Sequence, residues 1–148
     1  MYLGYQNGKI KFYTEESLNQ EFYNLEKVEE TDLEYVLDGE EYVLKDEAWE
    51  EKQAQEEKER IAMLSLTRGD VFRGLLMAKG VTRAQLRAMI ETNELLSVVE
   101  REMALIDFDE ALNFYRGNAL IDTVGLALGI SSEQLNKFFE TNDYTTLL

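Results

Sequence analysis

The first 45 positions contain short runs rich in Tyr, Val, Ile and Phe that are separated by turn residues, and such runs predict strands. Residues 2–5 and 9–13 are rich in Tyr, Ile and Phe and flank Gln6-Asn7-Gly8. Asn-Gly between two such runs is a strong hairpin signal, because both residues tolerate a positive φ. We therefore predict an antiparallel hairpin at the start of the chain.

A second hairpin is predicted where residues 34–37 and 41–44 flank Asp38-Gly39-Glu40, with Asp-Gly at the turn. A weaker apolar pattern from Phe22 to Val28 predicts one further strand. Two hairpins give a small antiparallel sheet, which needs cover on one face. Trp49 follows closely after the second hairpin, and we expect it to act as a structural lid, with a binding contact as the alternative.

The pattern changes at Asp46, where a helix with almost no apolar face is predicted to run to Leu64. Asp46 suits the N-cap, and Ala54 is the only apolar residue between positions 50 and 60. We expect this acidic helix to connect two bodies. If two copies paired along it, the seam would consist of polar side chains, so we expect a monomer or a weak dimer.

After Leu64 the pattern predicts short helices with clear caps. Thr67 and Gly80 bracket the first helix, and Thr82 with Gln85 forms a capping-box signature for the next. The segment 94–116 is predicted to divide into two helices near Asp107, where Glu110 completes another box.

The last part repeats the first helical hairpin at an offset of 49 residues. Residues 80–93 are GVTRAQLRAMIETN and residues 129–142 are GISSEQLNKFFETN, identical at Gly, Gln, Leu and the closing Glu-Thr-Asn. Capping explains part of this likeness, so duplication and convergence on one hairpin geometry both stay open. The chain as a whole predicts an α+β fold: an antiparallel β domain over 1–45, the connecting helix over 46–64, and a helical bundle over 65–148 with similar hairpins at 67–93 and 118–142.

The formal charge of −15 is concentrated in the front of the chain. Residues 1–64 hold 7 basic and 18 acidic side chains, a net charge of −11, whereas residues 65–148 hold 8 and 12, a net charge of −4. Such a chain is repelled by phosphate backbones and anionic membranes. We therefore expect a protein partner, with neither nucleic acid nor membrane as the target. The start of the chain lacks a signal-peptide pattern, which predicts cytoplasmic synthesis.

Catalytic and metal-binding motifs are missing from the sequence. The chain has no His or Cys, no Gly-rich phosphate loop after a strand and no Gly-x-Ser-x-Gly elbow. The densest carboxylates, at 56–59 and 107–110, lack the spacing of a calcium loop and suit a solvated helix face and a cap. We expect no enzymatic activity, no cofactor and no metal.

One helical hairpin carries enough positive charge to suggest DNA reading. In the hairpin 67–93, Arg83 and Arg87 would lie one turn apart on the second helix, where a helix-turn-helix protein places base contacts. The second hairpin lacks these basic residues, and the chain is acidic. A helix-turn-helix regulator is therefore the least favoured of three candidate functions.

Three stretches resemble small proteins of phage and prophage tail modules from Gram-positive bacteria: MYLGYQNGKIKFYTE, EEYVLKDEAWEEKQAQEEKERI and LTRGDVFRGLLMAKGVTRAQL. The layout of strands, acidic helix and C-terminal region is also similar to tail-fibre assembly proteins. The resemblance implies a non-enzymatic tail accessory protein, either a chaperone or adaptor for a tail-fibre or receptor-binding protein or a minor tail component. It would reside in the bacterial host cytoplasm or in the virion tail. No binding residue carries over from the family.

The acidic front half suggests an alternative from another class, a phage-encoded inhibitor that imitates nucleic acid in the groove of a host defence nuclease, as anti-CRISPR proteins do. Its carboxylates would imitate spaced phosphates. The candidate partner-binding residues for all three functions are Glu29, Glu30, Asp32, Glu34, Trp49, Arg83 and Arg87.

Overall fold

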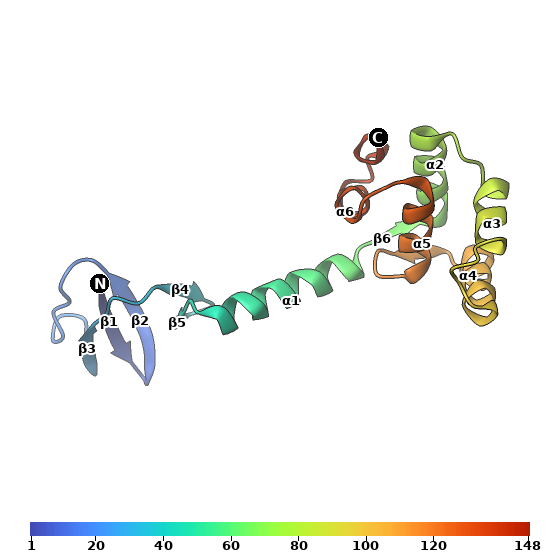
Figure 1. The fold of residues 1–148 in the computed structure, drawn as a ribbon. Helices are drawn as coiled ribbons and strands as arrows, with labels where there is room; N and C mark the ends of the chain where they lie inside the picture. Colours follow the sequence, from blue (N-terminus) through green and yellow to red (C-terminus); the bar gives the residue numbers. More distant parts are fainter. The chain divides into compact units, whose positions relative to one another are not determined.

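A computed structural model describes all 148 residues and confirms the α+β fold (Figure 1). The strands of the front part are β1 (Tyr2–Gln6), β2 (Lys9–Thr14), β3 (Lys27–Glu30), β4 (Tyr35–Asp38) and β5 (Glu41–Leu44). Helix α1 (Glu47–Met63) follows. The remaining elements are β6 (Ser65–Thr67), α2 (Arg68–Lys79), α3 (Arg83–Glu91), α4 (Val98–Glu110), β7 (Asn113–Tyr115), α5 (Ala119–Leu128), α6 (Ser132–Thr141) and the 3₁₀ turn η1 (Tyr144–Leu147).

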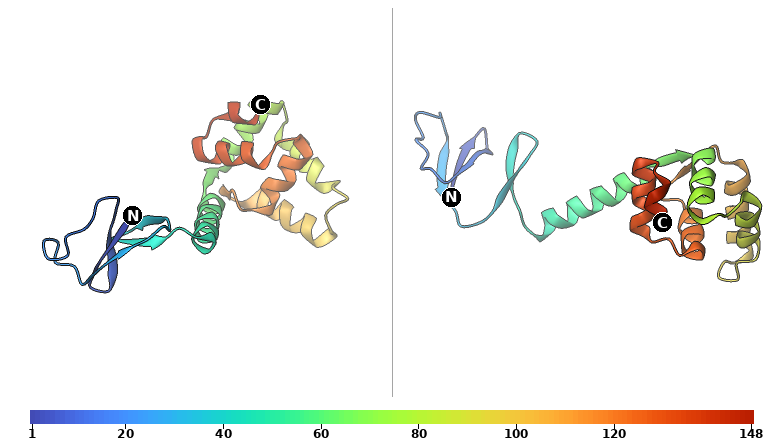
Figure 2. Two further views of the ribbon diagram at one scale, coloured as in Figure 1. Left: turned by 60° about the vertical axis from the view of Figure 1, so that its left-hand side comes forward. Right: turned by 90° about the horizontal axis from the view of Figure 1, so that it is seen from above.

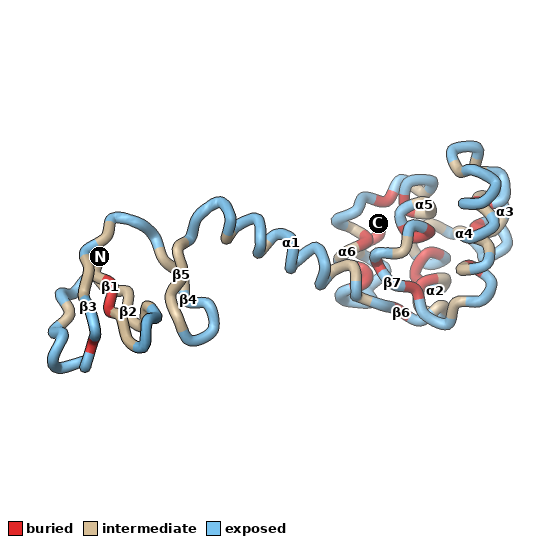
Figure 3. Tube along the Cα trace, turned by 90° about the horizontal axis from the view of Figure 1, so that it is seen from below, coloured by how far each residue is buried: buried red, intermediate tan, exposed pale blue.

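The chain forms two compact units, Met1–Glu56 and Glu57–Leu148, and the boundary between them falls within α1. This helix begins as predicted, because the Trp49 backbone N–H donates a 2.9 Å hydrogen bond to Asp46 Oδ1. None of its residues is buried, and Figure 3 shows it almost entirely in the colour of exposed residues. Its ion pairs, such as Arg60 with Glu57, lie at the surface.

Both predicted hairpins form in the first unit. Asn7 and Gly8 have φ of 54° and 71° at the turn between β1 and β2, as a type I′ turn requires. Between β4 and β5 only Gly39 has a positive φ, 65°, so glycine occupies the first central position of the turn. The strands form a three-stranded antiparallel sheet in the order β2-β1-β3 and a separate two-stranded sheet, β4-β5.

The strand expected over residues 22–28 was wrongly placed. Strand β3 starts only at Lys27, because Asn24 has a φ of 53° and turns the chain. Leu25 follows this turn and is buried, with Leu3, in the small core of the unit. Phe22 stays 78% exposed. The apolar residues at the start of this segment therefore belong to a turn.

The second unit holds most of the buried apolar residues. The predicted hairpins 67–93 and 118–142 correspond to α2 with α3 and to α5 with α6. Gly80 and Gly129 end the first helix of each hairpin with φ of 66° and 68°. In both views of Figure 2, η1 lies beside α2 and α6, where Leu147 completes the core. The buried core residues are Leu66, Val71, Leu75, Leu86, Ile90, Phe108, Phe114, Leu120, Ile121, Ile130, Leu135, Phe138, Phe139 and Leu147.

The two hairpins match each other in detail. Thr82 and Ser131 each form a complete capping box with the glutamine three residues later. At the other end of these helices, the hydroxyl of Thr92 donates to Ala88 O at 2.8 Å, and the hydroxyl of Thr141 donates to Lys137 O at 2.7 Å. Each hairpin is also preceded by a three-residue strand, and these two strands pair with each other.

The predicted division of residues 94–116 near Asp107 is wrong. Helix α4 runs unbroken from Val98 to Glu110 and is capped at its start by a box between Ser97 and Glu100. Phe108 is buried one residue after the expected break, and this anchors the last turn. Asp107 does not cap a helix; it accepts a 3.0 Å hydrogen bond from Asn118 Nδ2.

The C-terminal unit also contains a short ribbon that the predicted all-α bundle lacked. Strands β6 and β7 pair antiparallel, with Leu66 opposite Phe114. Both of these side chains are buried, whereas their neighbours along each strand are exposed. Runs of three residues are too short for the alternation to be recognised in the sequence.

Candidate protein-binding surfaces

The acidic candidates of the first unit lie on and after β3, and two of them are engaged within the unit. Glu29 Oε2 accepts a 2.6 Å hydrogen bond from the Tyr5 hydroxyl, and Glu29 also pairs with Lys27. These contacts with Lys27 and Tyr5 lower the pKa of Glu29. Glu34 pairs with Lys45 at 3.1 Å. Neither carboxylate is therefore a free anionic group.

Two further carboxylates of this unit, Glu26 and Glu41, are also engaged. Glu26 accepts the backbone N–H groups of the first hairpin turn, and its role is to hold that turn. Glu41 pairs with Lys9 at 3.4 Å. Among the four acidic candidates, only Glu30 and Asp32 are exposed without a partner in the chain. The four candidates therefore supply only two free carboxylates toward a row that would imitate a nucleic-acid backbone.

We expect the Tyr5 hydroxyl to lose its proton at a higher pH than an ordinary tyrosine hydroxyl does. Its hydrogen bond to Glu29, together with burial and the charge of Glu29, raises the pKa of Tyr5 from 10 to about 12. Because the folded-state pKa lies above the unfolded one, this contribution to stability is complete below pH 10 and is lost as the pH rises toward 12. An ultraviolet titration of phenolate absorbance checks this. Tyr5→Phe should remove the ionisation step at the highest pH, and Glu29→Gln should move that step to lower pH. An unchanged titration curve in both variants would contradict the hydrogen bond between Tyr5 and Glu29.

Trp49 occupies the first turn of α1, where its backbone N–H completes the helix cap. The ring is half-buried, which is intermediate between a core residue and an exposed contact. The indole Nε1–H is enclosed and has no hydrogen-bond acceptor. The role of lid and the role of partner contact therefore both stay predictions for this residue.

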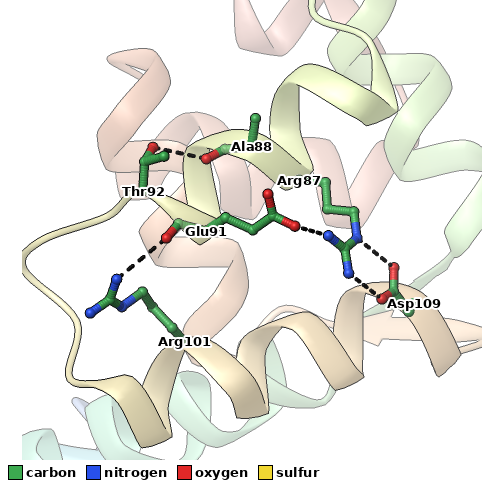
Figure 4. Close-up of polar contacts among 6 residues, drawn as sticks. All are labelled: Arg87, Ala88, Glu91, Thr92, Arg101 and Asp109. Carbon is green, nitrogen blue, oxygen red and sulfur yellow. Dashed lines mark hydrogen bonds and ion pairs between the residues drawn. The ribbon is translucent and has the colours of Figure 1, made fainter.

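The two arginines that suggested DNA reading have different contacts in the structure. Arg83 is exposed near the start of α3 and has no partner in the chain. Arg87, one turn later, is held by Asp109 of α4, with its Nη2 3.0 Å and its Nε 3.3 Å from the two carboxylate oxygens, and it also pairs with Glu91 (Figure 4). The two side chains thus do not form a free basic pair for a DNA groove.

The Arg87 cluster joins α3 to α4. The Arg87 guanidinium lowers the pKa of the Asp109 carboxyl, so the pair is charged at neutral pH. Further along, Arg101 Nη1 donates to the Glu91 carbonyl oxygen at 3.3 Å, and Figure 4 shows this contact bridging the same two helices. These polar contacts fix the spacing of a groove between α3 and α4.

Sequence reasoning missed the most distinctive feature of this groove, an exposed apolar face on α4. Phe108 is the only buried residue of the helix. Val98 and Val99 are each 68% exposed, Met103 is 62% exposed and Ile106 is 59% exposed. The apolar positions at 99, 103 and 106 were visible in the sequence, but the sequence pattern does not show which face of the helix the rest of the unit covers. Exposed apolar groups gathered on one face are typical of interaction sites.

Other kinds of site find little support in the structure. No group of three or more Asp or Glu side chains has the geometry to hold a metal ion. No helix combines the length and the apolar character that crossing a bilayer needs. Function therefore has to be inferred from the surfaces described above. Comparison of the chain with protein-family models, curated proteins and solved structures finds no match.

Proposed function

We propose that the chain is a non-enzymatic phage tail accessory protein, an assembly chaperone or adaptor that binds a tail-fibre or receptor-binding protein. The phage assignment is taken from the resemblance of its three quoted stretches to tail-module proteins. Its protein-binding character is supported by one observation above the others, the exposed apolar face of α4.

The division of the chain is consistent with an adaptor. Each of the two units has its own set of packed elements, and the helix that contains their boundary has no buried residue. The two parts of the chain also differ in net charge: residues 1–64 have a net charge of −11 and residues 65–148 a net charge of −4. Two parts of different charge suit a protein that contacts two partners.

The inhibitor of a host nuclease is a weaker candidate, because Glu26, Glu29, Glu34 and Glu41 are engaged inside the first unit. DNA reading is weakened in the same way by the contacts of Arg87. Neither alternative has a specific observation in its favour.

A pull-down tests the proposal. The tagged full-length chain is expected to recover a tail-fibre, baseplate or receptor-binding protein from cells that express the phage genes, at moderate salt and with identification by mass spectrometry. Recovery of a host nuclease that is released as salt rises would replace the proposal with the acidic inhibitor. Recovery of no tail protein, under conditions in which tails assemble, would also overturn it.

A further inference from the structure

Helix α4 exposes a second apolar stripe besides the residues that it packs against the core. A surface helix buries its apolar stripe and turns charged residues outward. In α4 the residues Val99, Met103 and Ile106 follow one another at helical spacing, and all three are more than half exposed. Phe108, with Ala104 and Leu105 packed against the core beside it, anchors another face of this helix, so the exposed stripe lies outside the unit's own packing.

The stripe borders the groove between α3 and α4 that the Arg87 cluster fixes. The apolar part of the groove consists of Val98, Leu105 and Ile106. Glu102 and Glu110 lie on its α4 side and form no hydrogen bond or ion pair within the chain. The groove thus offers apolar contacts together with two exposed carboxylates. The pKa of the Arg87 guanidinium is raised by its hydrogen bond to Asp109 and also by the charge of Glu102, which lies nearby.

Acidic residues outnumber basic ones around the stripe, and the groove itself is lined by four carboxylates and two arginines: Glu91, Glu102, Asp109, Glu110, Arg87 and Arg101. From Glu94 to Glu110 the chain has one basic residue, Arg101, and the acidic residues at positions 94, 100, 102, 107, 109 and 110, a net charge of −5. An apolar stripe inside an acidic segment is complementary to a partner that has the same stripe inside a basic one. The helical spacing of the stripe further matches a helix lying along the groove.

We propose that the face formed by α3 and α4 binds a basic amphipathic helix of the partner protein. Apolar side chains of that helix would cover Val99, Met103 and Ile106, and its Lys or Arg residues would pair with Glu102 and Glu110. This inference rests on the proposed protein-binding function and specifies the segment that the partner contributes.

Charge distinguishes this occupant from others. A second copy of the chain would bring one acidic α4 against another, which costs free energy, because like charges repel across an interface. An anionic membrane or a nucleic acid would be repelled in the same way. A basic helix satisfies both the apolar and the charged groups of the face.

The test uses the full-length chain and a fluorescent helical peptide of about 18 residues built from Leu and Lys, which spans about five turns. Anisotropy should show binding of this peptide and none of a matched peptide built from Leu and Glu. Met103→Asp should weaken binding about tenfold or more, because it places a charge in the apolar contact. Met77→Asp is the matched control, since Met77 lies on α2 and is 58% exposed against 62% for Met103.

A second pair of variants tests the charges. Glu102→Gln with Glu110→Gln should weaken binding several-fold and should reduce its dependence on salt, because two ion pairs are lost. Both positions are exposed in α4, so the fold is expected to persist, and circular dichroism verifies this for every variant. Glu133→Gln, at an exposed position of α6, removes one carboxylate outside the groove and should leave binding unchanged.

Several outcomes would overturn the inference. Equal weakening by Met77→Asp, binding of the acidic peptide, or self-association of the chain that Met103→Asp abolishes would each remove the basic helix as occupant. The pull-down separates this inference from the proposed function. If Met103→Asp still recovers the tail protein, the face is wrong and the function stands. If the wild type binds the Lys-rich peptide but recovers no tail protein, the function is wrong and the face stands.

Discussion

Replacing Phe138 by alanine should lower the free energy of unfolding of the C-terminal unit by about 3–5 kcal/mol, the usual cost of removing a buried aromatic ring. Phe138 is 1% exposed on α6, and its ring lies directly against Gly74 of α2. A Cβ at position 74 would lie 2.4 Å from Phe138 Cζ, so the ring occupies the space that any other residue there would need. This contact holds the two helical hairpins together.

The same contact predicts that Gly74→Ala destabilises the wild type but stabilises the Phe138→Ala variant. In the wild type, Gly74→Ala should cost about 1–3 kcal/mol, because the new methyl group overlaps the ring. In the Phe138→Ala background the overlap is gone, and Gly74→Ala should stabilise the protein by up to about 1 kcal/mol through the higher helix propensity of alanine. The four variants form a thermodynamic cycle that isolates this contact.

Urea denaturation followed by far-ultraviolet circular dichroism measures these differences, since most of the helix lies in the C-terminal unit. Phe22→Ala is the control, because that ring is 78% exposed in the first unit and its loss should change stability by less than about 0.5 kcal/mol. A cost below about 1 kcal/mol for Phe138→Ala, or additive effects in the cycle, would show that the ring is not packed against Gly74.

The second large effect concerns Arg116, the one buried charged residue of the chain. Its Nη1 lies 2.8 Å from Asp122 Oδ1, and its Nε donates to Asn136 Oδ1 at 2.7 Å. Asp122→Ala would leave the guanidinium buried without its counter-charge and should cost about 3 kcal/mol. Arg116→Met should cost less, because the Asp122 side chain is 57% exposed and water can solvate it once the arginine is gone.

Urea denaturation of both variants and of the double variant checks this order. Glu56→Ala is the control: it removes one partner of an exposed ion pair with Lys52 and should change stability by no more than about 0.5 kcal/mol. If Arg116→Met is the more damaging of the two substitutions, then the hydrogen bonds of the guanidinium, such as the one to Asn136, and not compensation of its charge by Asp122, are what the site contributes.

Local signals were sufficient for much of the fold. Asn7-Gly8 fixes a turn by backbone conformation alone, and Thr82 and Ser131 cap helices through side chains three residues away. Such interactions are complete within a few residues, so the sequence predicts them. The break expected near Asp107 failed because the same Asp-x-x-Glu spacing also occurs inside helices, and burial of Phe108 decides the outcome.

Less of the candidate site could be predicted from the sequence. Arg87 and Asp109 lie 22 positions apart, and nothing in either local pattern indicates that they meet. The exposure of Met103 and Ile106 likewise depends on which face of α4 the rest of the unit covers. Tertiary packing therefore turned Arg87 from a candidate DNA contact into a structural ion pair, and it turned apolar residues that would suit a core into surface.

The ribbon of β6 and β7 has a consequence for any attempt to divide the C-terminal unit. One strand precedes each helical hairpin, and Leu66 is paired with Phe114 across the ribbon. A fragment that contains only one hairpin would have an open strand edge with a bare apolar side chain. Two such fragments can close this edge by pairing with each other, in the manner of a domain swap. The linked chain prevents that exchange, because it supplies both strands at a high effective concentration.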